Sequence, residues 1–407
     1  MDLDAYRAQA QALASDLNRA HHRRFAGLDG AWDPAPIYAA HAGAFEPATI
    51  EALRGAAAAE ADPAAPMRRL LRFAVESRLA AVTADAEAER ARAEAEEGLA
   101  ALTAALAGEE DLACRVQLEE QRLDVVARRL TPPAAEALER VRAEARALGW
   151  PSPRAMLCEL HGVDLGAVAA EAEALLRVTA VPALPGDVVA RHDLPRVQRA
   201  AWADVALPEP LPHLRAAIAE LGLEPAFALD AEPRAQKSPR AFCAAVRVPE
   251  DVHLVVVPDG GLPGLEALFH EAGHALHLGH RAPGAPFEDR HLVDRVEAEA
   301  VAFAFEARAV PDGGDAALAE HRAAMGLLRA RRLAASLLHD LDLLDAGPHP
   351  SLRERYARRM ATATSLSWPA APWLAAGDPL VRSADYLRAL GRARSLDDGR
   401  LVAAITG

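Results

Sequence analysis

Residues 268–274 read Leu-Phe-His-Glu-Ala-Gly-His, which places two histidines four positions apart and a glutamate directly after the first of them. On an α-helix, positions i and i+4 lie on one face with their Cβ atoms about 5–6 Å apart. The imidazoles of His270 and His274 can therefore reach a single Zn²⁺ at roughly 2.0–2.1 Å. Glu271 then lies beside the metal without binding it, where a carboxylate can take a proton from a metal-bound water and later pass it to a leaving amine. The spacing predicts a helix that carries the active site of a zinc metallopeptidase.

A third protein ligand must complete such a site, since the five-residue motif is only moderately specific in a chain with 15 histidines. His280 lies ten residues after His270, a separation that supplies a third histidine when a glycine ends the helix seven residues after the first one. His277 occupies that position here, and the next glycine is Gly279, which disfavours this route. We expect His277, on the same helix face, to be a hydrogen-bonded histidine in the wall of the cleft.

The second candidate for the third ligand is a glutamate in the apolar helix predicted over residues 296–306. At 100° per residue, Glu297 and Glu299 point about 160° apart, so only one of them can face the metal. Glu299, 25 residues after His274, shares its face with Glu306. The pattern favours Glu299 as the ligand. Glu306 either orients an imidazole N–H of the site or forms a surface ion pair.

The rest of the chain is dominated by helical periodicity, above all over residues 1–180, where the longest run extends from Met67 towards Leu106. Prolines between residues 182 and 212 break the middle of the chain into short pieces and suggest a boundary. We therefore divide the chain into an N-terminal helical part, residues 1–180, and a catalytic part, residues 181–407, within one integrated fold.

A β-hairpin is predicted directly before the histidine-bearing helix. The runs Phe242–Val248 and Val252–Val257 are rich in residues that favour strands, and a proline-containing turn joins them. An edge strand at Cys243–Arg247 could align an extended peptide through main-chain hydrogen bonds. The sequence thus predicts a mainly α-helical protein with a small β-hairpin or sheet beside the zinc helix.

The composition limits the classes of partner. The formal net charge of −14 argues against nucleic acid, whose binding requires concentrated cationic side chains. The sequence contains no run of about 18 uncharged apolar residues, so it predicts no membrane span. The first residues lack the pattern of a secretory signal, and we therefore expect a cytoplasmic protein. The three cysteines are widely separated, which indicates neither a disulfide framework nor a thiolate metal site. The oligomeric state is not predicted.

The residues around the motif resemble the zinc-helix signature of the thimet oligopeptidase and oligoendopeptidase family, a group of gluzincin metallopeptidases. The resemblance rests on the Leu-Phe before the first histidine, the glycine before the second and the following His277. In that family a glutamate followed by a small residue is the third zinc ligand, with another acidic residue seven positions on, which corresponds to Glu299 and Glu306. Shorter similarities at residues 147–152 and 237–242 extend the resemblance over about residues 140–390.

The resemblance implies a mostly helical, two-lobed, zincin-like body around a deep cleft with one zinc ion on its floor. It also implies that only short or unfolded peptides enter the cleft. Family members carry tyrosines near the C-terminus that donate hydrogen bonds to the carbonyl under attack, and residues 383–390 are similar to that segment, with Tyr386 as the corresponding tyrosine. A structural role for Tyr386 in an amphipathic helix is the alternative.

The function predicted from these residues is zinc-dependent hydrolysis of peptide bonds in short or unfolded peptides. Zn²⁺ is held by His270, His274 and Glu299, Glu271 acts as general base and acid, and Tyr386 stabilises the oxyanion. Two alternatives remain open. The same chemistry could act on a small amide or a peptide-derived metabolite, or the chain could bind peptides with weakened catalysis.

Overall fold

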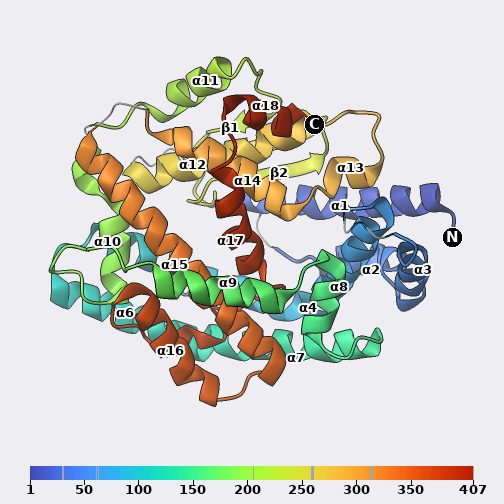
Figure 1. Ribbon diagram of the computed structural model, residues 1–407, viewed down its shortest axis with the longest axis horizontal. Coiled ribbons are helices and arrows are strands. Elements are labelled where there is room, and N and C mark those ends of the chain that lie inside the picture. Colours follow the sequence, from blue (N-terminus) through green and yellow to red (C-terminus); the bar gives the residue numbers. More distant parts are fainter. Residues whose placement is uncertain are drawn as a thin grey trace. The chain divides into compact units, whose positions relative to one another are not determined.

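The computed structural model consists of helices and one small sheet (Figure 1). It describes residues 1–29, 32–60, 62, 64–204, 206–257, 261–311 and 315–406. Two of the longest helices, α4 (Pro66–Glu96) and α15 (Ala316–Ala346), each span 31 residues. The predicted mainly α-helical fold with a small β-sheet is confirmed.

The chain forms two compact units, each assembled from segments that are distant in sequence. Unit 1 comprises Met1–Ala81, Asp204–Gly314 and Arg388–Gly407, and unit 2 comprises Val82–Ala203 and Asp315–Leu387. Their boundaries differ from the boundary near residue 180 that the prolines suggested. The reason is packing, since helix α1 (Leu3–Phe25), at the start of the chain, packs against the sheet and the histidine-bearing helix lies in the same unit.

Unit 1 holds the sheet, which has the order β1-β3-β2. The central strand β3 (Asp251–Val255) pairs in parallel with β1 (Ala228–Asp230) and antiparallel with β2 (Phe242–Arg247). The predicted hairpin is therefore present. The short strand β1 is an addition that the sequence pattern did not reveal. The helices of unit 1 are α1, α2 (Ala35–Ala40), η1 (Ala42–Ala44), α3 (Pro47–Ala57), the first part of α4, α11 (Pro210–Glu220), α12 (Gly261–Gly279), α13 (Phe287–His291), α14 (Arg295–Glu306), η5 (Ala307–Ala309), the end of α17 (Arg382–Ala393) and α18 (Asp398–Thr406).

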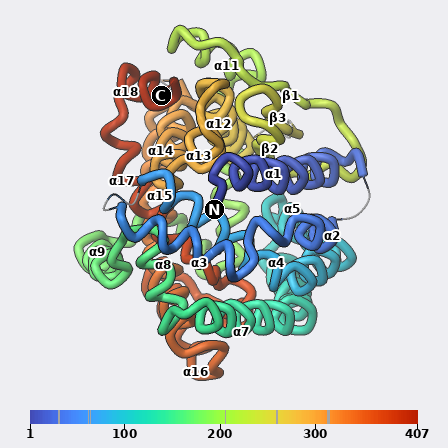
Figure 2. The backbone as a smooth tube through the Cα atoms, turned by 90° about the vertical axis from the view of Figure 1, so that its right-hand side faces the viewer, coloured from blue at the N-terminus to red at the C-terminus, as the bar shows by residue number. Residues whose placement is uncertain are grey.

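The two faces of the sheet are covered by different helices, because side chains alternate along each strand. Phe242 points towards α1, where its ring lies 5.3 Å from that of His21. Cys243 and Ala245 face the other way and pack into the apolar core that includes Leu268 and Phe269 of α12. Figure 2 shows α1, β2 and α12 lying close together. This arrangement brings strand β2 alongside the histidine-bearing helix.

The regular elements described in unit 2 are helices, and an isolated parallel bridge joins Ala190 to Ser367. The predicted run from Met67 to Leu106 is split in two, because Gly98 adopts the left-handed conformation (φ +63°) and separates α4 from α5 (Leu99–Gly108). The remaining elements of unit 2 are α6 (Leu112–Val125), the π-helical turn η2 (Val126–Leu130), α7 (Thr131–Ala147), α8 (Pro153–His161), α9 (Leu165–Val178), η3 (Arg191–Asp193), α10 (Leu194–Arg199), η4 (Ala201–Ala203), α15, α16 (Ser351–Thr364), η6 (Ala371–Trp373) and the start of α17.

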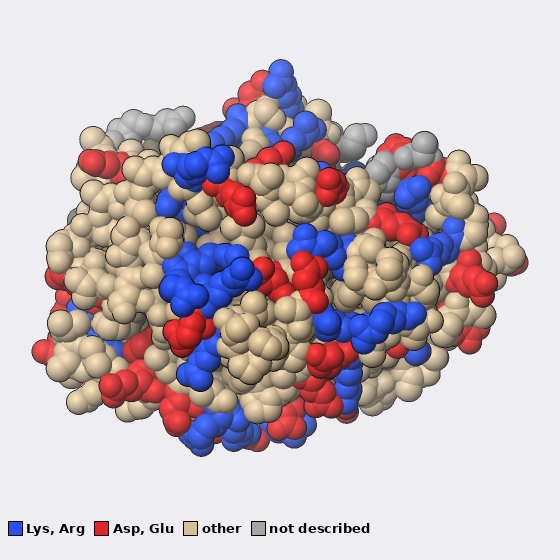
Figure 3. Space-filling model, turned by 60° about the horizontal axis from the view of Figure 1, so that its bottom comes forward, with Lys and Arg blue, Asp and Glu red and all other residues tan. Residues whose placement is uncertain are grey.

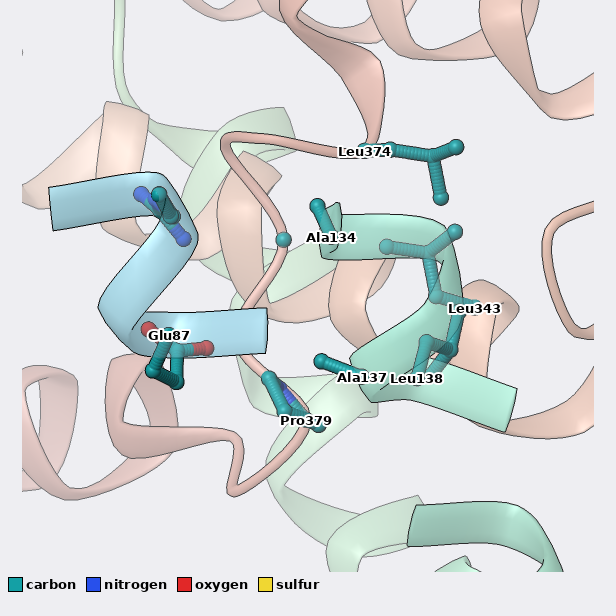
Figure 4. Close-up of a pocket in the computed structure, with 9 residues that line it drawn as sticks. Glu87, Ala134, Ala137, Leu138, Leu343, Leu374 and Pro379 are labelled. Atoms are coloured by element: carbon teal, nitrogen blue, oxygen red, sulfur yellow. The ribbon is translucent and has the colours of Figure 1, made fainter. Parts of the chain in front are cut away.

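A small pocket in unit 2 lies between helices α4, α7 and α15 (Figure 4). Its volume of about 20 Å³ is space for roughly one water molecule. Apolar side chains such as Leu138, Leu343 and Leu374 line much of it. A pocket of this size cannot receive a peptide.

The described surface gives two further observations. On the face drawn in Figure 3, acidic and basic side chains are interspersed, so that face offers no continuous basic surface. None of the described helices combines the length and the apolar character needed to cross a membrane.

Candidate metal centre

The histidine-bearing helix α12 forms because its apolar residues recur at helical spacing and are buried on one side. Leu265, Leu268, Phe269, Ala272 and Leu276 are each at most 2% exposed and belong to the core of unit 1. His270 and His274 are only partly buried, with 15% and 18% of their side-chain surfaces exposed. Both imidazoles thus lie together on one helix face, as their spacing predicts.

Helix α14 supplies the carboxylates. Its first turn is capped by Asp294, whose side chain accepts a hydrogen bond from the backbone N–H of Glu297 at 3.0 Å. Phe305 of α14 stacks on Phe269 of α12 with the ring centroids 5.5 Å apart. This contact, deep in the core, fixes the register between the two helices and hence the height of Glu299 relative to the histidines.

Gly273 permits the close approach of α12 and α14. A Cβ atom at this position would lie 2.8 Å from the Cα atom of Ala302 and 3.1 Å from the Cβ atom of Phe305. The first of these distances is too short for any real side chain, and the obstructing atom is backbone. The glycine between the two histidines is therefore required by helix packing.

We predict that Gly273→Ala destabilises the protein by about 1–3 kcal/mol, the usual cost of overpacking a filled core. Because α14 must move away from α12, the same substitution should weaken metal binding. Thermal unfolding and metal titration measure the two effects. Gly326→Ala is the matched control, since no described atom outside its own helix backbone lies within 4 Å of its added Cβ atom. Equal behaviour of the two variants would contradict the packing argument.

Three donor groups converge between the helices. The Oε2 atom of Glu299 lies 3.4 Å from Nε2 of His270 and 3.6 Å from Nε2 of His274. The three groups each offer one atom, and these atoms lie within 4.8 Å of one another. A tetrahedral Zn²⁺ with bonds of roughly 2.0–2.1 Å separates its ligand atoms by roughly 3.3–3.4 Å. The observed spacing fits such an ion.

The environment of Glu299 also fits a cation. Its side chain is only 10% exposed, and its Oε2 atom is buried without a hydrogen-bond partner among the described residues. An unsatisfied buried carboxylate oxygen is costly unless a positive charge compensates it. An ion between the two imidazoles would supply that charge in place of the proton that the raised pKa of His270 keeps on its ring in the metal-free protein.

Glu306 orients the first histidine. Its Oε2 atom lies 2.9 Å from Nδ1 of His270, so an N–H at Nδ1 donates to the carboxylate and leaves Nε2 directed at the donor group. Of the two roles considered for Glu306, the structure places it in the orienting one. The 36-residue separation from His270 explains why sequence spacing alone left the choice open.

Charge interactions in the donor group shift two pKa values in opposite directions. Burial alone raises the pKa of Glu299, but the adjacent His270 and His274 lower it to about 2. Burial lowers the pKa of His270, but Glu299 and Glu306 outweigh it and raise that pKa to about 9. Without a metal, the group therefore holds an ionised carboxylate next to a protonated imidazole at neutral pH.

The raised pKa of His270 predicts that metal binding depends on pH. A metal needs the neutral imidazole, whereas below about pH 9 the metal-free protein keeps His270 protonated. Affinity should therefore rise by about one log unit per pH unit between pH 6 and 8 and level off near the pKa. Competition with a chromophoric chelator, corrected for the chelator's own protonation, measures this. Affinity that is constant over this range would show that no proton is displaced.

Glu271 is anchored by the hairpin. The backbone N–H of Cys243 in β2 donates a hydrogen bond to Oε2 of Glu271 at 2.9 Å. This contact was not predicted, because a backbone donor leaves no trace in residue type. The only signal in the sequence was the position of the hairpin directly before the helix. Burial raises the pKa of the Cys243 thiol, so this cysteine stays protonated beside the site.

The remaining candidates fall outside the donor group. His280 lies just beyond α12, where its Nδ1 is 2.9 Å from the carbonyl of Leu276, and it is not one of the three converging residues. His277 is fully buried and in contact with Arg281. Tyr386 lies on α17 in unit 2, whereas the donor group lies in unit 1. Its role towards the substrate stays a prediction.

Comparison with known proteins shows the fold. No family model matches the sequence, and no curated protein matches it. A solved structure assigned as an oligoendopeptidase F has a TM-score of 0.51 at 13% identity, over 96% of this chain and 77% of that one. PZ peptidase A, solved with an inhibitor, has a TM-score of 0.51 at 12% identity, over 96% of this chain and 75% of that one. The chain is similar in fold to these helical peptidases.

Proposed function

We propose that this protein is a zinc-dependent peptidase that hydrolyses short or unfolded peptides. The observation that carries the proposal is the convergence of His270, His274 and Glu299 on one point, with a second glutamate, Glu271, next to them on α12. Two imidazoles and one carboxylate are one of the ligand sets of catalytic zinc sites, which keep a fourth position open. The similarity in fold to solved peptidases supports the same conclusion.

In this proposal, a bound Zn²⁺ supplies a Lewis acid that activates water and polarises the peptide carbonyl. Glu271 accepts a proton from the attacking water as the oxygen bonds to the carbonyl carbon. It then delivers that proton to the nitrogen as the C–N bond breaks. The Cys243 N–H holds one carboxylate oxygen of Glu271 and leaves the other for the water. We assign hydrogen-bond donation to the developing oxyanion to Tyr386.

Strand β2 is the element we propose for peptide binding. It lies at an edge of the sheet order β1-β3-β2. An extended peptide can add to such an edge by main-chain hydrogen bonds, with alternate side chains setting the preference. Because the same strand anchors Glu271 through Cys243, a peptide bound along it would lie next to the catalytic carboxylate. This favours an extended peptide over a small amide as substrate.

Incubation of the zinc-loaded protein with a library of short peptides, followed by mass spectrometry, tests the proposed function. We expect cleavage products that disappear after treatment with a strong chelator and return on addition of Zn²⁺. Peptides N-methylated around the cleaved bond should react more slowly, since they cannot pair with β2. A protein that binds zinc and peptides but releases no product would be a binding protein, and hydrolysis confined to small amides would overturn the peptide assignment.

A further inference from the structure

Several arginines of unit 2 lie around one carboxylate, that of Glu119. Glu119 of α6 accepts paired hydrogen bonds from Arg191 at 2.7 and 2.9 Å and from Arg122 at 2.7 and 3.1 Å. One carboxylate thus serves two guanidinium groups. A third guanidinium, that of Arg332 on α15, lies in the same surroundings and is affected by the charge of Arg191.

Arg332 is placed on an aromatic surface instead of a carboxylate. Its guanidinium carbon lies 5.5 Å from the ring centroid of Trp368. Its Nε atom is buried and has no hydrogen-bond partner in the part of the chain that the structure describes. A buried cationic donor without an acceptor is costly, and the nearby charges of Arg191 and Arg329 add repulsion. A bound anion would accept a hydrogen bond from this guanidinium and offset the repulsion.

Tyr356 provides a second donor beside the same indole. The Nε1–H of Trp368 donates to the hydroxyl oxygen of Tyr356 at 3.2 Å, so the hydroxyl accepts one bond and retains its own proton for donation. Tyr356 is only 3% exposed. Burial raises the pKa of Tyr356, whereas the hydrogen bond with Trp368 and the positive charges of Arg332, Arg191 and Arg122 act in the opposite direction. An anion that accepted a hydrogen bond from this hydroxyl would also be attracted by the positive charges of the nearby arginines.

The indole that joins these two donors is held in place by the backbone. Ser367, directly before Trp368, exchanges two backbone hydrogen bonds with the segment at the start of η3. Its N–H donates to the carbonyl of Val189 at 2.9 Å, and its carbonyl accepts the N–H of Arg191 at 3.0 Å. Arg191 is in turn fixed by Glu119. These hydrogen bonds hold the segment of Trp368 in place before an anion binds, which lowers the entropic cost of binding.

We propose that Arg332, the hydroxyl of Tyr356 and the indole of Trp368 form a binding site for a small oxyanion, either a carboxylate or a phosphate group. Arginine suits both anions because its planar fork offers parallel N–H donors. The indole supports the guanidinium from one side, and the tyrosine hydroxyl donates to a second oxygen of the anion. Nothing in this site requires the metal centre of unit 1.

Isothermal titration of the full chain with inorganic phosphate, and separately with N-acetylglycine, tests this site before and after metal removal. We expect one equivalent of at least one probe to bind in both states. Arg332→Gln should weaken that binding by about 10- to 100-fold, the usual effect of losing a charge-assisted hydrogen bond. The probe that binds more tightly shows whether the site recognises a phosphate group or a carboxylate.

Two further variants make the result decisive. Arg358→Gln removes an exposed arginine from neighbouring α16 and should leave binding unchanged, which excludes a general effect of net charge. Tyr356→Phe keeps the ring packing and removes the hydroxyl, both as donor to the anion and as acceptor from Trp368, so it should weaken binding by about tenfold even if Arg332→Gln does not fold. Absence of binding at millimolar concentration, or equal binding by wild type, Arg332→Gln and Tyr356→Phe, would overturn the proposal.

Discussion

Replacing Glu271 with glutamine is expected to lower kcat for peptide hydrolysis by about 10²- to 10⁴-fold, because general acid–base catalysis contributes about that much and glutamine cannot carry a proton between water and amine. Its amide oxygen can still accept the hydrogen bond from Cys243, so the position of the side chain is preserved. Initial rates on a fluorogenic peptide from the library screen measure the effect.

The metal content of Glu271→Gln is the necessary control. Glu271 is not among the three converging donors, and we expect the variant to bind one Zn²⁺ with nearly wild-type affinity. A variant that loses both zinc and activity would show that Glu271 has a structural role. A variant that binds zinc and keeps activity within tenfold of wild type would remove Glu271 from the mechanism.

Replacing Glu299 with glutamine is expected to weaken zinc binding by more than about 100-fold, which exceeds the 10- to 100-fold loss typical of a residue that only supports a ligand. The carboxylate is the only negatively charged member of the donor group, and its buried Oε2 atom lies within 3.6 Å of both imidazoles. Titration of the metal-free protein with zinc in the presence of a competing chelator measures the affinity.

Glu297→Gln is the matched control for this substitution. Glu297 lies on the same helix, is also a glutamate, and points about 160° away from Glu299. We expect this variant to retain zinc affinity. If the two substitutions weaken binding equally, the effect comes from the net charge of α14 and the assignment of Glu299 as a ligand is wrong.

Much of the candidate site could be predicted because its parts lie on two helices with regular geometry. The separation of His270 and His274 defines one face of α12, and the same reasoning selects Glu299 over Glu297 on α14. The sequence suggested that Glu306 could orient an imidazole of the site but did not decide between this role and a surface ion pair, since its contact with His270 depends on how the two helices pack. Local periodicity therefore identifies the donor atoms, and tertiary packing decides their pairing.

The features that escaped prediction have a common origin in backbone geometry. The hydrogen bond from Cys243 to Glu271 uses a main-chain donor, which every residue except proline offers. Strand β1 has only three residues, too few to show an alternating pattern. Gly273 was noticed as part of a motif, but the reason for a glycine there exists only once α14 is in place, since an added Cβ atom would lie 2.8 Å from the Cα atom of Ala302.

Division of the chain into compact units could not be predicted either. Prolines near residue 182 marked a change in local structure, yet both units combine segments from before and after that point. Long-range contacts decide which segments fold together, such as the packing of α1 against β2. Such contacts leave no signal in the composition of either segment.

The most direct test of the proposed metal centre is anomalous diffraction at the zinc edge from crystals of the zinc-loaded full chain. We predict one strong peak at about 2.0–2.2 Å from Nε2 of His270, Nε2 of His274 and a carboxylate oxygen of Glu299. The Nδ1 atom of His270 should remain hydrogen-bonded to Glu306. A zinc ion bound elsewhere, or bound here with Glu299 turned away from it, would contradict the account.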